Sequence, residues 1–197
     1  MKINSIKTPI SFQKRFMTTA NVLNKGKVEE CNIFELNCDE DKDYFKKVAE
    51  DKNWKNTIFL DTIEKFFLND YFTEKTYTIE NKQEDCLGII DVDVYKDERI
   101  DINWIETCPK LAHNNILRRT KYVGKALVNF IINTAKENNI KKVSVPEIAE
   151  TSHKFYKKYG FSFITNEGED AVITAENYDD VLEKNSSYMK VKKKDEN

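Results

Sequence analysis

The sequence predicts a mixed α/β fold built as a single domain. Stretches of alternating apolar and polar residues, which indicate strands, are interspersed with stretches that have the apolar period of a helix. A chain of 197 residues suits one domain with a sizeable core, and it contains no internal repeat. The expected order is strand, two helices, three strands, helix, strand, helix and two strands, which is typical of a sheet covered by helices.

The N-terminal part of the chain is basic and shows little periodicity. Residues 1–27 contain six lysine and arginine residues and no acidic residue, so we expect a loosely ordered basic arm. A transit peptide is the alternative, but a single arginine is thin support for it. The folded domain is expected over residues 28–191, with a polar tail over 192–197.

The first half of the domain is expected to contain four strands, of which the first is at 27–36. Helices are expected around 39–53 and 59–67, where apolar side chains recur at helical spacing. The strands that follow are 76–80, 86–95 and 99–108. Because a short polar turn joins the last two strands, we expect them to form an antiparallel hairpin.

The second half of the chain alternates between helices and strands. A helix with Leu127 and Ile131 on its apolar face is expected to end at Asn138 and Asn139, because asparagine tolerates the left-handed conformation of a C-cap. The elements expected after it are a strand at 141–147, a helix at 150–160, a strand at 161–164, an acidic connection at 165–185 and a closing strand at 186–192.

The composition argues against several classes of function. The net charge is −2, so the whole molecule has no bulk attraction to nucleic acid or to an anionic membrane. No apolar run approaches the length of a bilayer span, and nothing near the start resembles a secretory signal. The four cysteines form no CxxC pair, and the two histidines do not complete a metal site. We expect a cytoplasmic protein with reduced cysteines and no metal. The basic arm and the lysine-rich end are too sparse to favour nucleic acid, and no membrane partner is expected.

One of only five glycines, Gly124, lies where a helix begins. Glycine costs roughly 1 kcal/mol relative to alanine inside a helix, so its presence there needs a reason. The first amides of a helix have no intrahelical partner, and the helix dipole favours an anion beside them. The cationic residues around this turn are Arg118, Arg119, Lys121 and Lys125. The turn therefore predicts a phosphate site, although a glycine that only packs beneath a helix would leave the same pattern.

A second motif, "HKFYKKYGF", follows at 153–161. Phe155 and Tyr159 lie four residues apart and are expected to pack on the sheet, and Gly160 is placed to end the helix. Tyr156 lies about 100° around the helix from Phe155, so it need not share that burial. The spacing alone leaves Tyr156 open as a surface residue.

Together these segments resemble the GNAT superfamily of acyl-CoA-dependent N-acyltransferases. The sequence "KYVGKA" (121–126) is similar to its Q/R-x-x-G-x-G/A signature, and "FYKKYGF" (155–161) to its F-Y-x-K-x-G-F segment. The sequence "IETCP" (105–109) resembles the strand end before the signature, and "YMKVK" (188–192) the closing strand. The resemblance covers about residues 28–191. It implies a mixed, mostly antiparallel sheet that is splayed between its fourth and fifth strands and flanked by helices.

The resemblance also implies acetyl-CoA as co-substrate. Its pyrophosphate is expected on the amides at the helix start, and its pantetheine beside the preceding strand end, as an added strand. Departures from the family pattern are Lys121 in place of arginine or glutamine and Tyr122 in place of a frequent glycine. The residues expected to bind the cofactor are Ile105, Thr107, Arg119, Lys121, Tyr122, Val123, Gly124, Lys125 and Ala126.

The chemistry that the resemblance implies is acetyl transfer to a primary amine. Tyr156 matches the family's general acid, which protonates the leaving thiolate. Glu106, at the strand end beside the expected thioester, is the candidate base, with His113 as a lesser candidate. A water chain as the base, with Glu106 only a solvated carboxylate, stays open.

The acceptor is expected to be a small-molecule or peptide amine. The acidic segment 165–185 favours a cationic one, such as a polyamine, an amino sugar or a basic peptide terminus, unless its charge serves only solubility. A non-catalytic acyl-CoA sensor or scaffold is the alternative function. The oligomeric state is left open, with a homodimer as one option.

Overall fold

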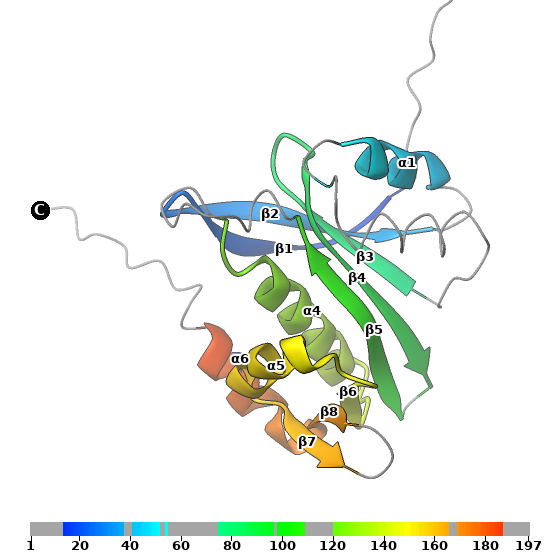
Figure 1. Cartoon of the computed structure of the whole chain (residues 1–197), viewed down its shortest axis with the longest axis vertical. Coiled ribbons are helices and arrows are strands. Elements are labelled where there is room, and N and C mark those ends of the chain that lie inside the picture. The colour runs from blue at the N-terminus through cyan, green and yellow to red at the C-terminus, as the bar shows by residue number, and fades with distance from the viewer. Residues whose placement is uncertain are drawn as a thin grey trace, which may run out of the picture.

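The described part of the chain folds around one mixed sheet. The computed structural model describes residues 14–37, 41–51, 54, 75–96, 98–108, 120–165 and 169–186. Its strands are β1 (Arg15–Asn24), β2 (Lys27–Leu36), β3 (Lys75–Glu80), β4 (Cys86–Tyr95), β5 (Arg99–Thr107), β6 (Lys142–Val145), β7 (Ser162–Thr165) and β8 (Glu169–Thr174). Its helices are α1 (Lys42–Glu50), α4 (Val123–Glu137), α5 (His153–Tyr159) and α6 (Tyr178–Ser186), with short 3-10 turns at Glu150–Ser152 and Ala175–Asn177. Figure 1 shows these elements along the sheet.

The strands are ordered β1-β2-β3-β4-β5-β6-β8-β7 across the sheet. Each neighbouring pair is antiparallel except β5 and β6, which run parallel. The hairpin expected from the sequence is confirmed in β4 and β5, where Tyr95 pairs with Arg99 beside the turn. The sheet therefore confirms the predicted mixed, mostly antiparallel fold class.

Helices cover both faces of this sheet. Leu127 of α4 and Val181 of α6 share one buried cluster with Ile90 of β4. Tyr44 of α1 belongs to a second cluster, which contains Ile89 of the same strand. Because successive residues of a strand point to opposite faces, Ile89 and Ile90 assign α1 to one face and α4, α5 and α6 to the other.

A glycine in β4 allows α4 to lie directly on the sheet. A Cβ atom at Gly88 would lie 2.7 Å from Val123 Cγ1 and 3.1 Å from the carbonyl oxygen of Glu106. Both distances are shorter than ordinary contacts, so the close approach of the first turn of α4 depends on the missing side chain. A glycine inside an apolar strand is the pattern that marks such an approach.

Residues 15–24, which the sequence leads us to expect in a loosely ordered arm, instead form the edge strand β1. β1 pairs with β2 from Arg15–Glu35 to Asn24–Lys27. The two-residue turn between the strands places Lys25 at φ 50° and Gly26 at φ 79°, the left-handed conformations that a tight hairpin requires. The sequence of β1, RFMTTANVLN, lacks the regular apolar alternation that would have predicted a strand, and Val22 is its one buried residue.

The acidic segment is also more structured than expected. It contains β8, which lies between β6 and β7, and α6, which packs along α4. The predicted end of α4 is confirmed, because Asn139 has a left-handed φ of 55°. The helix expected at 59–67 lies outside the described residues, as does the expected closing strand apart from Ser186, which ends α6.

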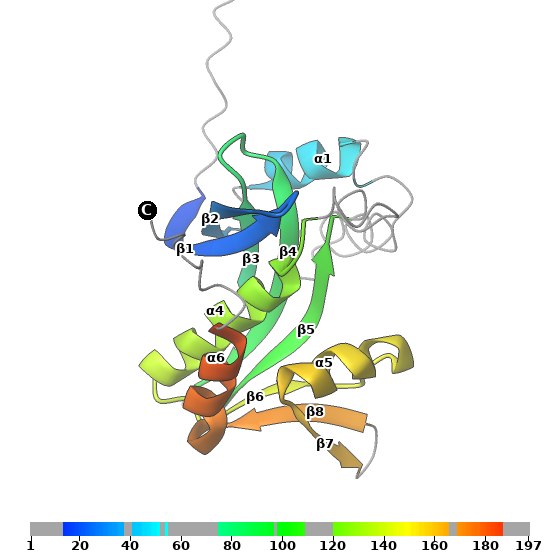
Figure 2. The ribbon, with the colours of Figure 1, turned by 90° about the vertical axis from the view of Figure 1, so that its left-hand side faces the viewer.

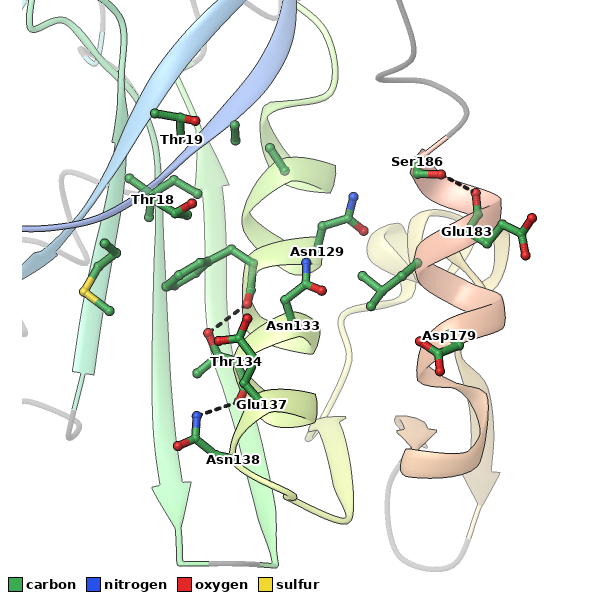
Figure 3. Close-up of a pocket in the computed structure, with 16 residues that line it drawn as sticks. Thr18, Thr19, Asn129, Asn133, Thr134, Glu137, Asn138, Asp179, Glu183 and Ser186 are labelled. Carbon is green, nitrogen blue, oxygen red and sulfur yellow. Dashed lines mark hydrogen bonds between the residues drawn. The ribbon is translucent and has the colours of Figure 1, made fainter.

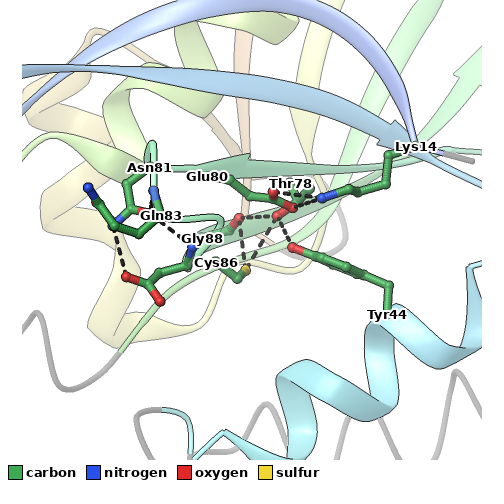
Figure 4. A network of polar contacts seen from close by, with 9 residues as sticks. Lys14, Tyr44, Thr78, Glu80, Asn81, Gln83, Cys86 and Gly88 are labelled. Atoms are coloured by element: carbon green, nitrogen blue, oxygen red, sulfur yellow. Dashed lines mark hydrogen bonds and ion pairs between the residues drawn. The ribbon is translucent and has the colours of Figure 1, made fainter. Parts of the chain in front are cut away.

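A polar network fastens the chain before β1 to the α1 face of the sheet (Figure 4). The ammonium of Lys14 lies 2.9 and 2.7 Å from the two carboxylate oxygens of Glu80, whose side chain is 2% exposed. The same ammonium lies 4.7 and 4.9 Å from the ring centres of Phe34 and Tyr44. The hydroxyl groups of Tyr44 and Thr78 are 3.0 Å apart. The network therefore ties three elements that are distant in the sequence.

Candidate active site

The sheet opens between β5 and β6. The two strands pair only over three positions, from Arg99–Lys142 to Asp101–Ser144, although β5 continues to Thr107. Figure 2 shows them leaving a common start in different directions, with α5 beside β6. The splay was expected between the fourth and fifth strands. They are numbered β5 and β6 here because the unexpected strand β1 precedes them. The end of β5 therefore lacks a neighbouring strand on this side, among the strands that the structure describes.

Gly124 lies where three of the sequence motifs meet. A Cβ atom at this position would lie 3.7 Å from Phe155 Cζ, 3.7 Å from Thr107 Cγ2 and 3.8 Å from Ile105 Cδ1. The fold therefore brings the end of β5, the start of α4 and the start of α5 together at this glycine. These are ordinary contact distances, so a methyl group fits there.

The turn before α4 has an unusual backbone. Tyr122 precedes the helix with a left-handed φ of 73°, a conformation that glycine adopts without strain. The amides of Val123 and Gly124 lie in the first turn, ahead of the first intrahelical bond. The amide of Ala126 donates to the carbonyl of Tyr122 at 2.8 Å. Ala126 was predicted to bind the cofactor, but its amide is already hydrogen bonded within the helix.

The hairpin of β1 and β2 hydrogen bonds to the turn before α4. The sequence did not predict this contact. The Leu23 amide donates to the carbonyl of Lys121 at 3.1 Å, and the Lys121 amide donates back to Leu23 at 2.8 Å. The hydroxyl of Thr120, a buried residue, also donates to the side-chain oxygen of Asn24 at 3.3 Å. The glycine of the β1–β2 turn is the one local feature that could have indicated this hairpin.

The two lysines predicted at this turn differ in their surroundings. Lys125 donates to the side-chain oxygen of Asn185 in α6 at 3.2 Å. Burial lowers the pKa of Lys125, and the nearby charges of Lys158 and Lys184 lower it further. Lys121 is half-buried, and Arg119 lies outside the described residues.

Tyr156 is buried, contrary to its reading as a surface residue. It is 3% exposed and makes edge-to-face contacts with Phe155 and Phe161. Burial raises its pKa to about 12, so the phenol keeps its proton at neutral pH. No described residue hydrogen bonds to this hydroxyl, whereas the hydroxyl of Tyr159 donates to Asn129. Of the two tyrosines, Tyr156 therefore has the hydroxyl that can serve a ligand.

Glu106 lies on the other face of β5 from Ile105 and Thr107, because side chains alternate along a strand. Its cross-strand partner is Ile89, which belongs to the cluster on the α1 face. Its side chain is half-buried, and burial raises its pKa to about 7. A carboxyl group with this pKa can accept a proton near neutral pH. The alternative base, His113, lies outside the described residues.

Two acids predicted to border an acceptor lie on a different surface. Asp179 and Glu183 line a groove of about 930 Å³ between β1, α4 and α6 (Figure 3). Asn133 also lines this groove, and at about 100° per residue it lies on the opposite side of α4 from Gly124. Asp179 further forms an ion pair with Lys136. Asp179 and Glu183 therefore do not mark an acceptor site beside Gly124.

The described residues show neither a metal-binding cluster nor a membrane-spanning helix. No group of three or more His, Cys, Asp and Glu side chains is placed there to hold a metal ion. No helix of the described part is long and apolar enough to cross a membrane. Cys31, Cys86 and Cys108 are buried and free of disulfides.

The fold is similar to that of solved acetyltransferases. A chimera of spermidine N-acetyltransferase SpeG from Vibrio cholerae and hSSAT has a TM-score of 0.51 at 14% identity, over 76% of this chain and 98% of that chain. AtaT complexed with acetyl-methionyl-tRNAfMet has a TM-score of 0.51 at 15% identity, over 77% of this chain and 99% of that chain. A mutant AtaT toxin bound to acetyl-CoA and the C-terminus of the antitoxin AtaR has a TM-score of 0.50 at 17% identity, over 77% and 98% of the two chains. No protein-family model and no curated protein matches the sequence. The likeness confirms the GNAT-like fold that the motifs implied.

Proposed function

We propose that the protein is an acetyl-CoA-dependent N-acetyltransferase that acts on a primary amine. The observation that carries this proposal is the meeting of Ile105, Thr107, Gly124 and Phe155 where β5 separates from β6. An open strand edge offers backbone groups to a pantetheine arm, and the start of α4 offers amides to a pyrophosphate. The fold shared with SpeG and AtaT supports the same activity.

Two side chains carry the proposed chemistry. Glu106 accepts a proton from the acceptor ammonium, directly or through water. The amine nitrogen then attacks the thioester carbonyl carbon, so that a C–N bond forms and the C–S bond breaks. Tyr156 donates its hydroxyl proton to the departing thiolate, and coenzyme A leaves as a thiol. After the C–N bond forms, the nitrogen still carries one surplus proton, which it loses to solvent to become the amide. The proton on Glu106 also passes to solvent, and the phenolate of Tyr156 takes one proton back from solvent.

Cofactor binding is tested at Gly124. Gly124→Glu should abolish acetyl-CoA binding in calorimetry, because its side chain would clash with Phe155 and its charge would repel the pyrophosphate. Gly124→Ala is the matched control and should bind as the unaltered protein does, since a Cβ atom there makes only ordinary contacts. Unchanged affinity in Gly124→Glu would reject this location of the cofactor.

The catalytic role is tested at Tyr156. Tyr156→Phe should lower turnover by about 10²-fold, the size usual for a general acid, and leave acetyl-CoA affinity nearly unchanged because the ring remains. A phenylalanine variant with full turnover, under conditions where chemistry limits the rate, would leave Tyr156 with a packing role. If the unaltered protein binds acetyl-CoA but acetylates no amine, the protein is a non-catalytic acyl-CoA sensor or scaffold and not an enzyme.

The acceptor class is part of the proposal, and we assign a cationic amine. The support is the negative charge that Glu106 gains when it ionises near neutral pH. A panel should include spermidine and an aminoacyl-tRNA, because SpeG is a spermidine N-acetyltransferase and AtaT forms a complex with acetyl-methionyl-tRNAfMet. An amino sugar, a basic peptide and a neutral amine complete the panel. The kcat/KM of the best acceptor should fall as ionic strength rises. A neutral acceptor with rates indifferent to salt would overturn this assignment.

A further inference from the structure

Helix α6 reaches the start of α4 through one buried side chain. Asn185 lies near the end of α6 and is 1% exposed. Its side-chain oxygen accepts a hydrogen bond from the ammonium of Lys125 at 3.2 Å. Lys125 follows Gly124 in the first turn of α4. The contact therefore joins a helix that the sequence did not predict to the turn proposed for the pyrophosphate.

The side chain of Asn185 is itself held in one orientation. Its nitrogen donates to the carbonyl of Tyr159 at 2.9 Å and to the carbonyl of Val181 at 2.8 Å. Tyr159 is the last residue of α5, and Val181 lies one turn earlier in α6. Both donors of the amide are used in this way, so its oxygen is the atom that faces Lys125. One buried amide therefore links α4, α5 and α6, which lie beside one another in Figures 1 and 2.

This contact restricts a flexible cation. A lysine side chain has four rotatable bonds, and it loses much of its rotamer freedom when its ammonium is held in one place. Because Asn185 already holds the ammonium of Lys125, a ligand that binds there does not have to order it. The side chains of a helix lean toward its N-terminus, so the ammonium stays near the amides of the first turn of α4.

An amide holds the ammonium of Lys125 without cancelling its charge. A carboxylate at position 185 would form an ion pair with Lys125 and would repel an anionic ligand. Burial lowers the pKa of Lys125, and the charges of Lys158 and Lys184 lower it further. Three positive charges therefore gather near the start of α4, a set that favours a ligand with more than one negative charge, such as a pyrophosphate.

We propose that Asn185 is a positioning residue of the cofactor site, which holds the ammonium of Lys125 beside the start of α4 for the pyrophosphate of acetyl-CoA. The inference rests on the proposed acetyltransferase function, and it adds α6 to the elements that build the site. Asn185 does not touch the reacting atoms. It should therefore act on cofactor affinity and not on the chemical step.

The test is a double-mutant cycle read by calorimetry with acetyl-CoA. Asn185→Leu, which has a similar shape and no polar atom, should raise the Kd about 5-fold, and Lys125→Met should raise it about 10-fold. In the Lys125→Met background, Asn185→Leu should change the Kd by less than about 2-fold, because no ammonium remains to be positioned. A merely structural loss would persist in that background. The kcat of Asn185→Leu at saturating acetyl-CoA should stay within about 2-fold of that of the unaltered protein.

Tyr178→Phe is the matched control. The hydroxyl of Tyr178, the first residue of α6, donates to the carbonyl of Ile140 at 3.1 Å. The variant loses a buried hydrogen bond of the same helix at the end away from Lys125, so the Kd for acetyl-CoA should not change. Denaturant unfolding shows that each variant is folded.

A second measurement needs no substitution of Asn185. NMR of the full chain with isotope-labelled lysine follows the titration of Lys125, whose signal is assigned by its loss in Lys125→Met. Addition of coenzyme A should raise the pKa of Lys125, because a nearby anion favours the charged ammonium. This measurement decides the case if Asn185→Leu does not fold.

Three results would overturn the inference while acetyl-CoA still binds, so that the proposed function stands. They are equal effects of Asn185→Leu and Tyr178→Phe on the Kd, additive effects in the cycle, and a Lys125 pKa that coenzyme A leaves unchanged. An unaltered protein that binds no acetyl-CoA would overturn the proposed function and this inference together.

Discussion

Burial moves two ionisable side chains in the same direction, and the proposed reaction needs both shifts. The pKa of Glu106 rises to about 7 and that of Tyr156 to about 12, in each case because burial disfavours the charged form. Between these values Glu106 is a carboxylate and Tyr156 a phenol. A base and an acid therefore coexist in the states that acetyl transfer requires.

The first prediction concerns the pH dependence of the reaction. As Glu106 loses its proton, kcat/KM for the amine should rise with pH and level off above about 7. Glu106→Gln should lower kcat/KM by about 10²-fold and remove this pH limb. A limb that survives in Glu106→Gln would assign the base to another group. The measurement is a rate profile from about pH 5 to 9 with saturating acetyl-CoA.

The same shift has a consequence for stability. The folded-state pKa of Glu106 lies above its ordinary value of 4.5, so the folded protein binds more protons than the unfolded chain between these values. The contribution of Glu106 to stability is therefore present at low pH and is lost as pH rises through about 7. Relative to Glu106→Gln, the unaltered protein should lose stability across this range, which urea unfolding at pH 4.5 and 8 would measure.

Two glycines give a matched pair of substitutions. Gly88→Ala should lower the free energy of unfolding by about 1–3 kcal/mol, because its Cβ would overlap Val123 and press on the Glu106 carbonyl. Gly124→Ala should be neutral or stabilising by up to about 1 kcal/mol, since the methyl group fits and alanine is the better helix former. Urea unfolding compares the two, and equal losses would contradict the close packing of α4 on β4.

Among the elements, the β1–β2 hairpin positions the start of α4. The backbone of Leu23 hydrogen bonds to the backbone of Lys121, and the side chain of Asn24 bonds to that of Thr120. Together these contacts fix the two residues that precede Tyr122. The next residue, Tyr122, has a left-handed backbone that costs about 1–3 kcal/mol and persists only where neighbours fix it. An edge strand far from the reacting atoms therefore helps to shape the proposed pyrophosphate turn.

This arrangement predicts an effect on cofactor affinity. Thr120→Val removes the hydroxyl donor at nearly constant volume and leaves the oxygen of Asn24 without this partner, at a cost of about 1 kcal/mol. The KM and Kd for acetyl-CoA should rise about 3- to 10-fold with little change in kcat. Thr120→Ser keeps the hydroxyl and should behave as the unaltered protein. Equal affinities for the valine and serine variants would show that the bond does not position the turn.

Across the whole molecule, the ion pair of Lys14 and Glu80 joins the residue before β1 to the last residue of β3. The carboxylate of Glu80 is 2% exposed and bonds to Lys14 through both oxygens (Figure 4). A buried pair of this kind adds little relative to apolar residues, but removing one partner leaves an uncompensated charge. The pair therefore makes the position of Lys14, directly before β1, specific.

Substitution of one partner or of both should separate these effects. Lys14→Met should lower the free energy of unfolding by about 3–5 kcal/mol, because Glu80 stays buried without its cation. The double variant Lys14→Met/Glu80→Gln should recover most of that loss. Denaturant unfolding measures both. A single variant as stable as the unaltered protein would show that residue 14 contributes little to the fold.

The sequence by itself determined the parts of this protein that depend on local spacing. The β4–β5 hairpin follows from two alternating stretches joined by a polar turn, and the end of α4 follows from Asn138 and Asn139. Gly160, with a φ of 124°, ends α5 as its place in the motif predicts. The motifs at 121–126 and 155–161 also implied the fold, and they pointed to the start of α4 and to α5 as parts of the site. Apart from the fold, which the resemblance of the motifs implied, each of these inferences uses residues that are close together in the sequence.

Only the tertiary structure decided which distant residues meet. The strand β1 is recognised only from its pairing with β2 and Lys121. The need for glycine at position 88 is likewise recognised only from the close approach of Val123. The pKa of Glu106 depends on what covers its side chain, and the acids of α6 lie at a groove because α6 packs along α4. These properties come from burial and from the charges and hydrogen-bonding groups around a side chain. Those surroundings are supplied by segments many residues away, and no local pattern in the sequence specifies them.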